Sequence, residues 1–186
     1  LAKPQIVTVT FADDPHRDRE EGFASFVGGS AWLAAVGAEY GVTGATSLAN
    51  VRRTDDGRGW TSTKALVAML NELIASGAAP KPLAPGAADA VLYVVYVPRT
   101  VQLKEDVARE GAVYCTTFSS FHGAALDAAD GVLFPYAIVA DCDTSGATDG
   151  ARVVAEGARA LVGAATNPYA APHAGRFVDV APPDPW

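Results

Sequence analysis

Apolar residues along the chain fall into two kinds of pattern, short β-branched runs and longer stripes with helical spacing. The run Gln5–Ala12 (QIVTVTFA) predicts a first strand, and Val42–Val51 is expected to be extended. Asp89–Pro98 (DAVLYVVYVP) is almost continuously apolar, which is typical of a central strand covered on both faces. Two further strands are predicted over Thr116–Ala125 and Phe134–Cys142.

Helical patterns separate these runs. Ser30 is a good N-cap residue for the segment that follows it, and Gly41 is a good stop for the same helix. The next helix begins at Thr61 or Ser62 and ends at Gly77, and its apolar residues fall on one stripe. We therefore expect helices over Arg19–Val27, Ser30–Tyr40, Ser62–Ser76 and Asp149–Ala165.

The alternation of strands and helices predicts an α/β fold, a three-layer sandwich with a mixed sheet. The chain has 186 residues, of which 49% are hydrophobic and 19% charged. That length and composition fit a single domain over residues 1–186 with a sizeable core. Residues 172–186 are rich in proline and are expected to form an irregular tail.

The net charge of −7 argues against nucleic acid or an anionic membrane as the main partner. Nucleic acid or an anionic membrane surface would favour a basic patch, and the 14 Lys and Arg residues are scattered along the sequence. No apolar run approaches the roughly 20 residues that a membrane-spanning helix needs. The chain begins at Leu1 rather than Met, which a removed signal peptide would explain. We therefore expect a secreted protein.

The only two cysteines are Cys115 and Cys142. In an exported protein a lone pair predicts a disulfide. The bond would tie the start of one late strand to the end of the next, which fits antiparallel neighbours. The alternative is a nucleophile at Cys115 served by His122, although nothing nearby in the sequence marks an activated thiolate.

The last predicted helix carries the candidate chemistry. Its helical spacing predicts a face that packs on the sheet, formed by Val154, Ala158, Leu161, Val162 and Ala165. The opposite face would hold Arg152, Glu156, Arg159, Ala160 and Gly163. Because Arg159 and Gly163 are four residues apart, their positions stack one turn above the other. Zinc peptidases place two metal ligands at this spacing, with a general-base Glu directly after the first.

Several segments together resemble a known family. They are QIVTVTFADDP at Gln5–Pro15, AWLAAVGAEYGV at Ala31–Val42, VLYVVYVP at Val91–Pro98, FHG at Phe121–Gly123, PYAIVADC at Pro135–Cys142 and ALVGAATNP at Ala160–Pro168. This set is similar to a family of secreted bacterial zincin-like proteins, found often in myxobacteria. It more distantly resembles the plant Exordium-like proteins, which have a comparable A-T-N-P segment without a complete zinc motif. The resemblance implies a zincin-like fold with a metallopeptidase-like site.

Family members with an intact motif read similar to S-H-E-L-V-E-A-A-T-N-P, whereas this chain reads A-R-A-L-V-G-A-A-T-N-P. The first ligand position is Arg159, the general-base position is Ala160 and the second ligand position is Gly163. A protonated guanidinium has no acceptor for a metal, and neither Ala nor Gly offers a side-chain ligand. We therefore expect no cofactor and a non-catalytic domain in extracellular binding or assembly.

In that hypothesis the former cleft is a binding groove formed by Arg159, Glu156, His122 and Asn167. Arg159 would meet an anionic or carbonyl group of a protein or polymer partner, or of a second copy of the chain. The simpler interpretation of this helix face is a solvated surface with helical ion pairs at Glu156, each worth a few tenths of a kcal/mol. A purely structural protein of an extracellular matrix is a third possibility.

The alternative function is a secreted metal-dependent hydrolase with a rearranged site. Its ligands would be His122, His173 and Asp143, which must then converge in space. A calcium loop is a further possibility, since Asp141, Asp143, Ser145, Gly146 and Asp149 fall at the ligand spacing of such loops. Position twelve of that loop is Arg152 instead of Glu, so an ordinary turn is the better interpretation.

A group of acidic residues surrounds the start of the first helix, where negative charge favours the helix dipole. Its members are Asp13, Asp14, Asp18, Glu20 and Glu21. That stabilising role accounts for the group without any further chemistry.

Overall fold

The structure is a computed structural model that describes residues 1–83, 90–101, 103, 115, 119–142 and 150–169. The predicted tail over residues 172–186 lies outside the described residues. The elements are β1 (Gln5–Thr10), α1 (Arg17–Gly29), α2 (Trp32–Gly37), the 3-10 turn η1 (Ala38–Tyr40), β2 (Thr46–Arg52), α3 (Thr63–Ala75), β3 (Val91–Val97), β4 (Ser120–Leu126), β5 (Leu133–Ala140) and α4 (Ala151–Thr166).

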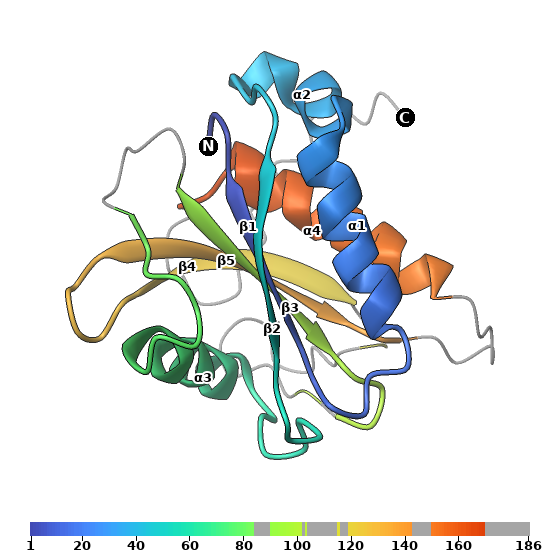
Figure 1. The fold of residues 1–186 in the computed structure, drawn as a ribbon, viewed down its shortest axis with the longest axis vertical. Coiled ribbons are helices and arrows are strands. Elements are labelled where there is room, and N and C mark those ends of the chain that lie inside the picture. Colours follow the sequence, from blue (N-terminus) through green and yellow to red (C-terminus); the bar gives the residue numbers. More distant parts are fainter. Residues whose placement is uncertain (84–89, 102, 104–114, 116–118, 143–149, 170–186) are drawn as a thin grey trace.

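The strands form one five-stranded sheet in the order β2-β1-β3-β5-β4 (Figure 1). The pairs β1–β2, β1–β3 and β3–β5 are parallel, and β4 pairs antiparallel with β5. Helix α3 covers one face of this sheet, and α1 and α4 cover the other. The predicted α/β class with a mixed sheet is confirmed, and so is the antiparallel pairing of the two late strands.

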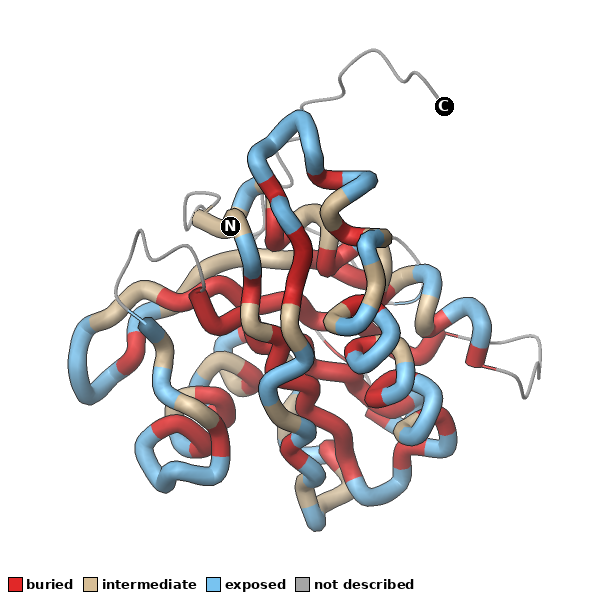
Figure 2. The backbone as a smooth tube through the Cα atoms, turned by 45° about the horizontal axis from the view of Figure 1, so that its top comes forward, coloured by how far each residue is buried: buried red, intermediate tan, exposed pale blue. Residues whose placement is uncertain are grey.

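Strand β3 lies at the centre of the sheet, and all seven of its residues are buried, as its continuous apolar run predicts. Alternate residues point to opposite faces. Tyr93 and Val95 therefore join the core under α3, whereas Leu92, Val94 and Tyr96 join the core under α1 and α4. Figure 2 shows the buried residues gathered along the sheet, with the outer sides of the helices exposed.

Local capping signals set several boundaries of the elements. The Ser62 hydroxyl accepts a hydrogen bond from the Ala65 amide at 3.1 Å, as expected of an N-cap. Gly41 has φ of 76° and ends η1 in the left-handed conformation predicted for a helix stop. The prediction at Ser30 was wrong by one residue, because α2 begins at Trp32 with Ala31 as its N-cap. The Ser30 hydroxyl still accepts the Trp32 amide hydrogen at 3.3 Å.

The predicted disulfide between Cys115 and Cys142 is present, and the two Cα atoms are 4.9 Å apart. Cys142 is buried two residues beyond the end of β5 and contributes to the core under α3. The bond rules out a free Cys115 thiolate as nucleophile in this form of the protein. Among the described helices, none is both long and apolar enough to span a membrane.

Candidate functional site

Helix α4 lies across β4 and β5, but its buried side differs from the predicted one. The prediction was right for Leu161 and Ala165, which are buried, and wrong for Ala160, which is 3% exposed instead of facing outward. Three residues expected on the sheet are only half-buried. They are Val154, Ala158 and Val162.

Small residues explain why α4 is rotated from the predicted orientation. Gly157 packs so closely on β3 that a Cβ atom there would lie 2.6 Å from the Tyr96 hydroxyl oxygen. Ala160 and Ala164 continue this side of the helix and are buried. A helix that approaches through Gly and Ala can come nearer to the sheet than one that approaches through Val. The pattern of hydrophobicity favoured the bulkier valines and so missed this contact.

Near the last turn of α4, His122 of β4 faces Gly163. A Cβ atom on Gly163 would lie 2.6 Å from Nδ1 and 2.7 Å from Cε1 of the imidazole. His122 is half-buried, and this burial lowers the pKa of its imidazole below the ordinary value of 6.5. The structure thus brings His122 onto the helix at the position where the resemblance expects a second metal ligand.

A separate set of polar contacts joins the same pair of elements. The Ser120 hydroxyl of β4 donates a hydrogen bond of 3.1 Å to Oε2 of Glu156. One guanidinium nitrogen of Arg159 lies 4.0 Å from the same oxygen. The Glu156 side chain is 17% exposed and the Arg159 side chain is 80% exposed. Glu156 is therefore held against the strand, and Arg159 projects from the surface.

We call this surface the α4–β4 face and define it by Ser120, His122, Glu156, Arg159 and Gly163. Three of the four predicted binding residues lie on it. The fourth, Asn167, is the exposed C-cap of α4, where its backbone N–H donates to the Gly163 carbonyl at 2.8 Å. Asn167 therefore lies one turn beyond Gly163 along the helix.

The proposed ligands of a rearranged metal site are only partly described. His173 and Asp143 lie outside the described residues, as does most of the possible calcium loop. His16 contacts Gly150 at the first end of α4, whereas His122 contacts Gly163 near the last. Gly163 follows Gly150 by thirteen positions along the helix, a rise of about 20 Å, so the two imidazoles cannot share a metal ion. Within the described ranges, no three His, Cys, Asp or Glu side chains are grouped to hold one.

The first residue of the possible calcium loop, Asp141, has other neighbours. One of its carboxylate oxygens is 3.5 Å from Nε of Arg99 and 3.8 Å from Nε2 of His16. Asp141 is only 3% exposed. Arg152, at the last position of that loop, is exposed on α4.

The acidic group at the start of α1 is different from the one predicted. Asp18 is exposed, but Asp14, Glu20 and Glu21 are buried. The Glu20 carboxyl is in hydrogen-bond contact with that of Asp14 and is close to Asp141. Burial and these carboxylates raise the pKa of Glu20 to about 10. Sequence reasoning missed this cluster, since acidic residues in the first turn of a helix are ordinarily solvated.

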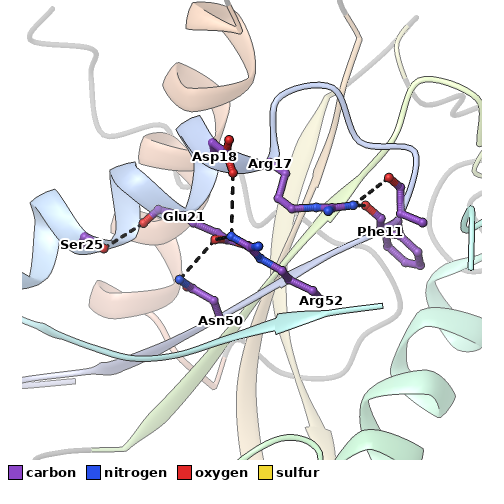
Figure 3. A network of polar contacts seen from close by, with 8 residues as sticks. Phe11, Arg17, Asp18, Glu21, Ser25, Asn50 and Arg52 are labelled. Carbon is purple, nitrogen blue, oxygen red and sulfur yellow. Dashed lines mark hydrogen bonds and ion pairs between the residues drawn. The ribbon is translucent and has the colours of Figure 1, made fainter. Parts of the chain in front are cut away.

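Glu21 and Arg17 face other partners near the cluster (Figure 3). Both oxygens of Glu21 accept from Arg52 of β2, at 2.8 and 2.6 Å. The Arg17 guanidinium donates to the carbonyl oxygens of Phe11 and Ala12, just beyond β1. Glu21 and Arg17 thus join α1 to the sheet. In the described structure, neither Arg17 nor Arg52 forms an ion pair with Asp14 or Glu20.

Comparisons with models of protein families, with curated proteins and with solved structures found no match to this chain.

Proposed function

We propose that the chain is a zincin-like domain without peptidase activity that acts outside the cell as a binding module, with the α4–β4 face as its binding surface. One observation carries the proposal, the contact between His122 and Gly163. In the resembling family the residue at position 163 would supply a metal ligand. Here the imidazole ring fills the space that any side chain at that position would need.

The two other motif positions support the same conclusion. Arg159 points into solvent with a permanent positive charge, which opposes a dication at the same place. Ala160, at the position of the general base, is buried against the sheet and has no proton-accepting group. A peptidase needs a metal-bound water and a base to activate it, and none of these three residues supplies either function.

The exposed guanidinium of Arg159 on the α4–β4 face suits a partner that offers a carboxylate or a carbonyl oxygen. The Arg159 guanidinium has five N–H donors in a planar fork. Among the described residues, its one ion pair is the 4.0 Å contact with Glu156, which is long and leaves donors directed to solvent. Because Glu156 is fixed by Ser120, it would hold the guanidinium in place without neutralising it fully.

The absence of peptidase chemistry is tested by elemental analysis of the purified protein, before and after mild chelation. We expect no stoichiometric transition metal and a thermal midpoint that chelator leaves unchanged. A bound metal that is lost on changing His122→Ala would contradict the proposal and favour the rearranged hydrolase instead.

The binding surface is tested by an NMR titration with a short peptide that ends in a free carboxylate. We expect shifts at Arg159 and Glu156, and no shifts when the same peptide ends in an amide. The change Arg159→Gln should abolish the response. The matched control is Arg152→Gln, an exposed arginine on the same helix, which should leave it intact. An equal response to both peptides would rule out carboxylate recognition at this face.

A further inference from the structure

Two carboxyl groups are in contact beside the carboxyl ends of the parallel strands, between the sheet and α1, and a third lies nearby. Asp14 lies in the loop that joins β1 to α1, Glu20 lies in the first turns of α1, and Asp141 follows β5 directly. Their exposed fractions are 8%, 1% and 3%. Tyr96, which is fully buried on β3, borders the cluster, and burial, together with the charges of Glu20 and Asp14, raises the pKa of its phenol.

The positive groups around this cluster pair with other groups, face Asp141 or, like Arg19, are exposed. His16 and Arg99 lie on the Asp141 carboxylate. Arg52 pairs with Glu21, and Arg17 binds carbonyl oxygens. Arg19 lies beside Gly150 at the start of α4. In the part of the chain that the structure describes, no ion pair reaches Asp14 or Glu20.

The contact between Asp14 and Glu20 therefore needs a proton. An ionised carboxylate can only accept hydrogen bonds, so two of them cannot bond to each other. Oδ2 of Asp14 and Oε2 of Glu20 are both buried, and neither has a hydrogen-bond donor among the described residues. Two like charges that are buried side by side are strongly unfavourable, whereas a single shared proton removes one charge and supplies the missing donor.

We infer that Asp14 and Glu20 form a proton-sharing carboxyl pair that works as a pH-operated latch, holding the loop before α1 closed and releasing it as the pH rises. The inference does not depend on the proposed binding role. The loop is also held by the Asp14 side chain itself, whose Oδ1 accepts the His16 amide at 2.8 Å. His16 in turn packs on Gly150, so the latch connects the first end of α1 to the first end of α4.

The direction of the pH effect follows from the protonation of Glu20. Its pKa is raised from 4.5 to about 10 in the folded protein, mainly by burial and by the contact with Asp14. Between these values the unfolded chain has lost the proton and the folded chain keeps it. The contribution of this group to stability is thus complete below the unfolded pKa and is lost as the pH rises toward the folded one.

The test is chemical unfolding of the protein and of Glu20→Gln at several pH values between about 5 and 9. Gln keeps the shape and the donor of a protonated Glu but cannot ionise. We expect the folding equilibrium constant of the unmodified protein to fall, relative to that of the variant, by up to roughly tenfold for each pH unit, the value for one proton. Parallel profiles of the two proteins would overturn the inference.

Asp18→Asn is the matched control, because Asp18 belongs to the same helix and is 97% exposed. It should leave the pH profile unchanged. If Glu20→Gln does not fold, Asp14→Asn serves as the second variant, since it also removes the need for a shared proton and should flatten the profile. The carboxyl carbon of Glu20 in the unmodified protein gives a direct reading by NMR. A protonated signal at pH 7 is expected, and an ionised one would refute the latch.

The loop itself is followed by amide hydrogen exchange. As the pH rises, the His16 amide should exchange faster in the unmodified protein than in Glu20→Gln at the same pH. The Leu66 amide in α3, which bonds to the Ser62 carbonyl, serves as the internal reference. An equal ratio of rates at every pH would show that no local opening accompanies the loss of the proton.

Discussion

The contact of His122 with Gly163 shows how a single missing side chain can determine what lies on a helix surface. Glycine in a helix interior costs about 1 kcal/mol relative to alanine, so this position carries an intrinsic penalty. The space it leaves is taken by an imidazole from β4. Close packing between strand and helix therefore depends on the one residue type that has no Cβ.

We predict that Gly163→Ala destabilises the protein by about 1 kcal/mol, because the overlap with His122 outweighs the gain in helix propensity. Chemical unfolding measures the change. In a His122→Ala background the same substitution should be stabilising, since the overlap is gone and only the helix propensity remains. The same sign in both backgrounds would contradict the packing described for this pair.

A second prediction concerns the protonation of His122. Because burial lowers its pKa below 6.5, the ring should still be neutral just below that pH in the folded protein. The unfolded chain is then protonated and the folded chain is not, so this residue's contribution to stability is present above pH 6.5 and is lost as the pH falls through the folded pKa. A proton NMR titration of the ring should give a midpoint below the usual one. A midpoint at or above 6.5 would refute the burial effect.

The position of a side chain could be predicted where it depended only on residues close by in the sequence. The helical spacing placed Glu156 and Arg159 on one side of the last helix. The strand pattern placed His122 on a strand beside that helix. The raised pKa of Glu20 could not be predicted, because it depends on burial of the side chain and on the nearby Asp14 and Asp141, and Asp141 is 121 residues away in the chain. A polar residue in a first helical turn gives no local sign of such a partner.

At the scale of elements, α1 is fastened to the edge strand β2 by the pair of Glu21 and Arg52 (Figure 3). The carboxylate of Glu21 is almost fully buried, and the amide of Asn50 also reaches it at 3.4 Å. Asp18 is 3.8 Å from the same guanidinium but is exposed to solvent. Asp18 and Glu21 thus both lie near Arg52, but Asp18 does so in solvent and Glu21 in a buried position where charges interact more strongly.

We predict that Glu21→Gln lowers the free energy of unfolding by about 1 to 2 kcal/mol, because it removes a two-pronged charged hydrogen bond from a buried position. Asp18→Asn should have no measurable effect, as expected of an exposed pair. Urea unfolding of the two variants gives the comparison. Equal losses would mean that burial does not distinguish the two carboxylates.

Elements whose signals are local were predicted well. Ser62 and the glycines after the helices fixed the helix ends, and the apolar run of β3 gave its central position. The orientation of α4 was predicted less well. It depends on the hole above Tyr96 that only Gly157 fits, and hydrophobicity along the helix contains no information about that hole.

For the whole molecule, the disulfide is the one covalent link between distant parts of the chain. It joins residues 27 positions apart and closes a loop whose constraint on the unfolded chain is worth about 3 to 4 kcal/mol. We predict that replacing Cys115 and Cys142 together by Ser lowers the free energy of unfolding by about that amount. Denaturant unfolding of the double variant measures the loss. A loss well under 1 kcal/mol would show that the loop is already restricted in the unfolded chain.

The strand order also determines the time course of folding. Strand β3 lies in the middle of the sheet, but its two partners are far away in the sequence. It pairs Val91 with Gln5 of β1 and Tyr93 with Tyr136 of β5. Among the described strands, only β4 and β5 form a hairpin from neighbouring segments. Contacts between such distant segments must overcome a large loop-closure entropy before they give any stability. During synthesis from the N-terminus, β1 therefore stays unpaired on its β3 side until more than 90 residues have left the ribosome, and this open edge is the part of the nascent chain that most needs protection from other strands.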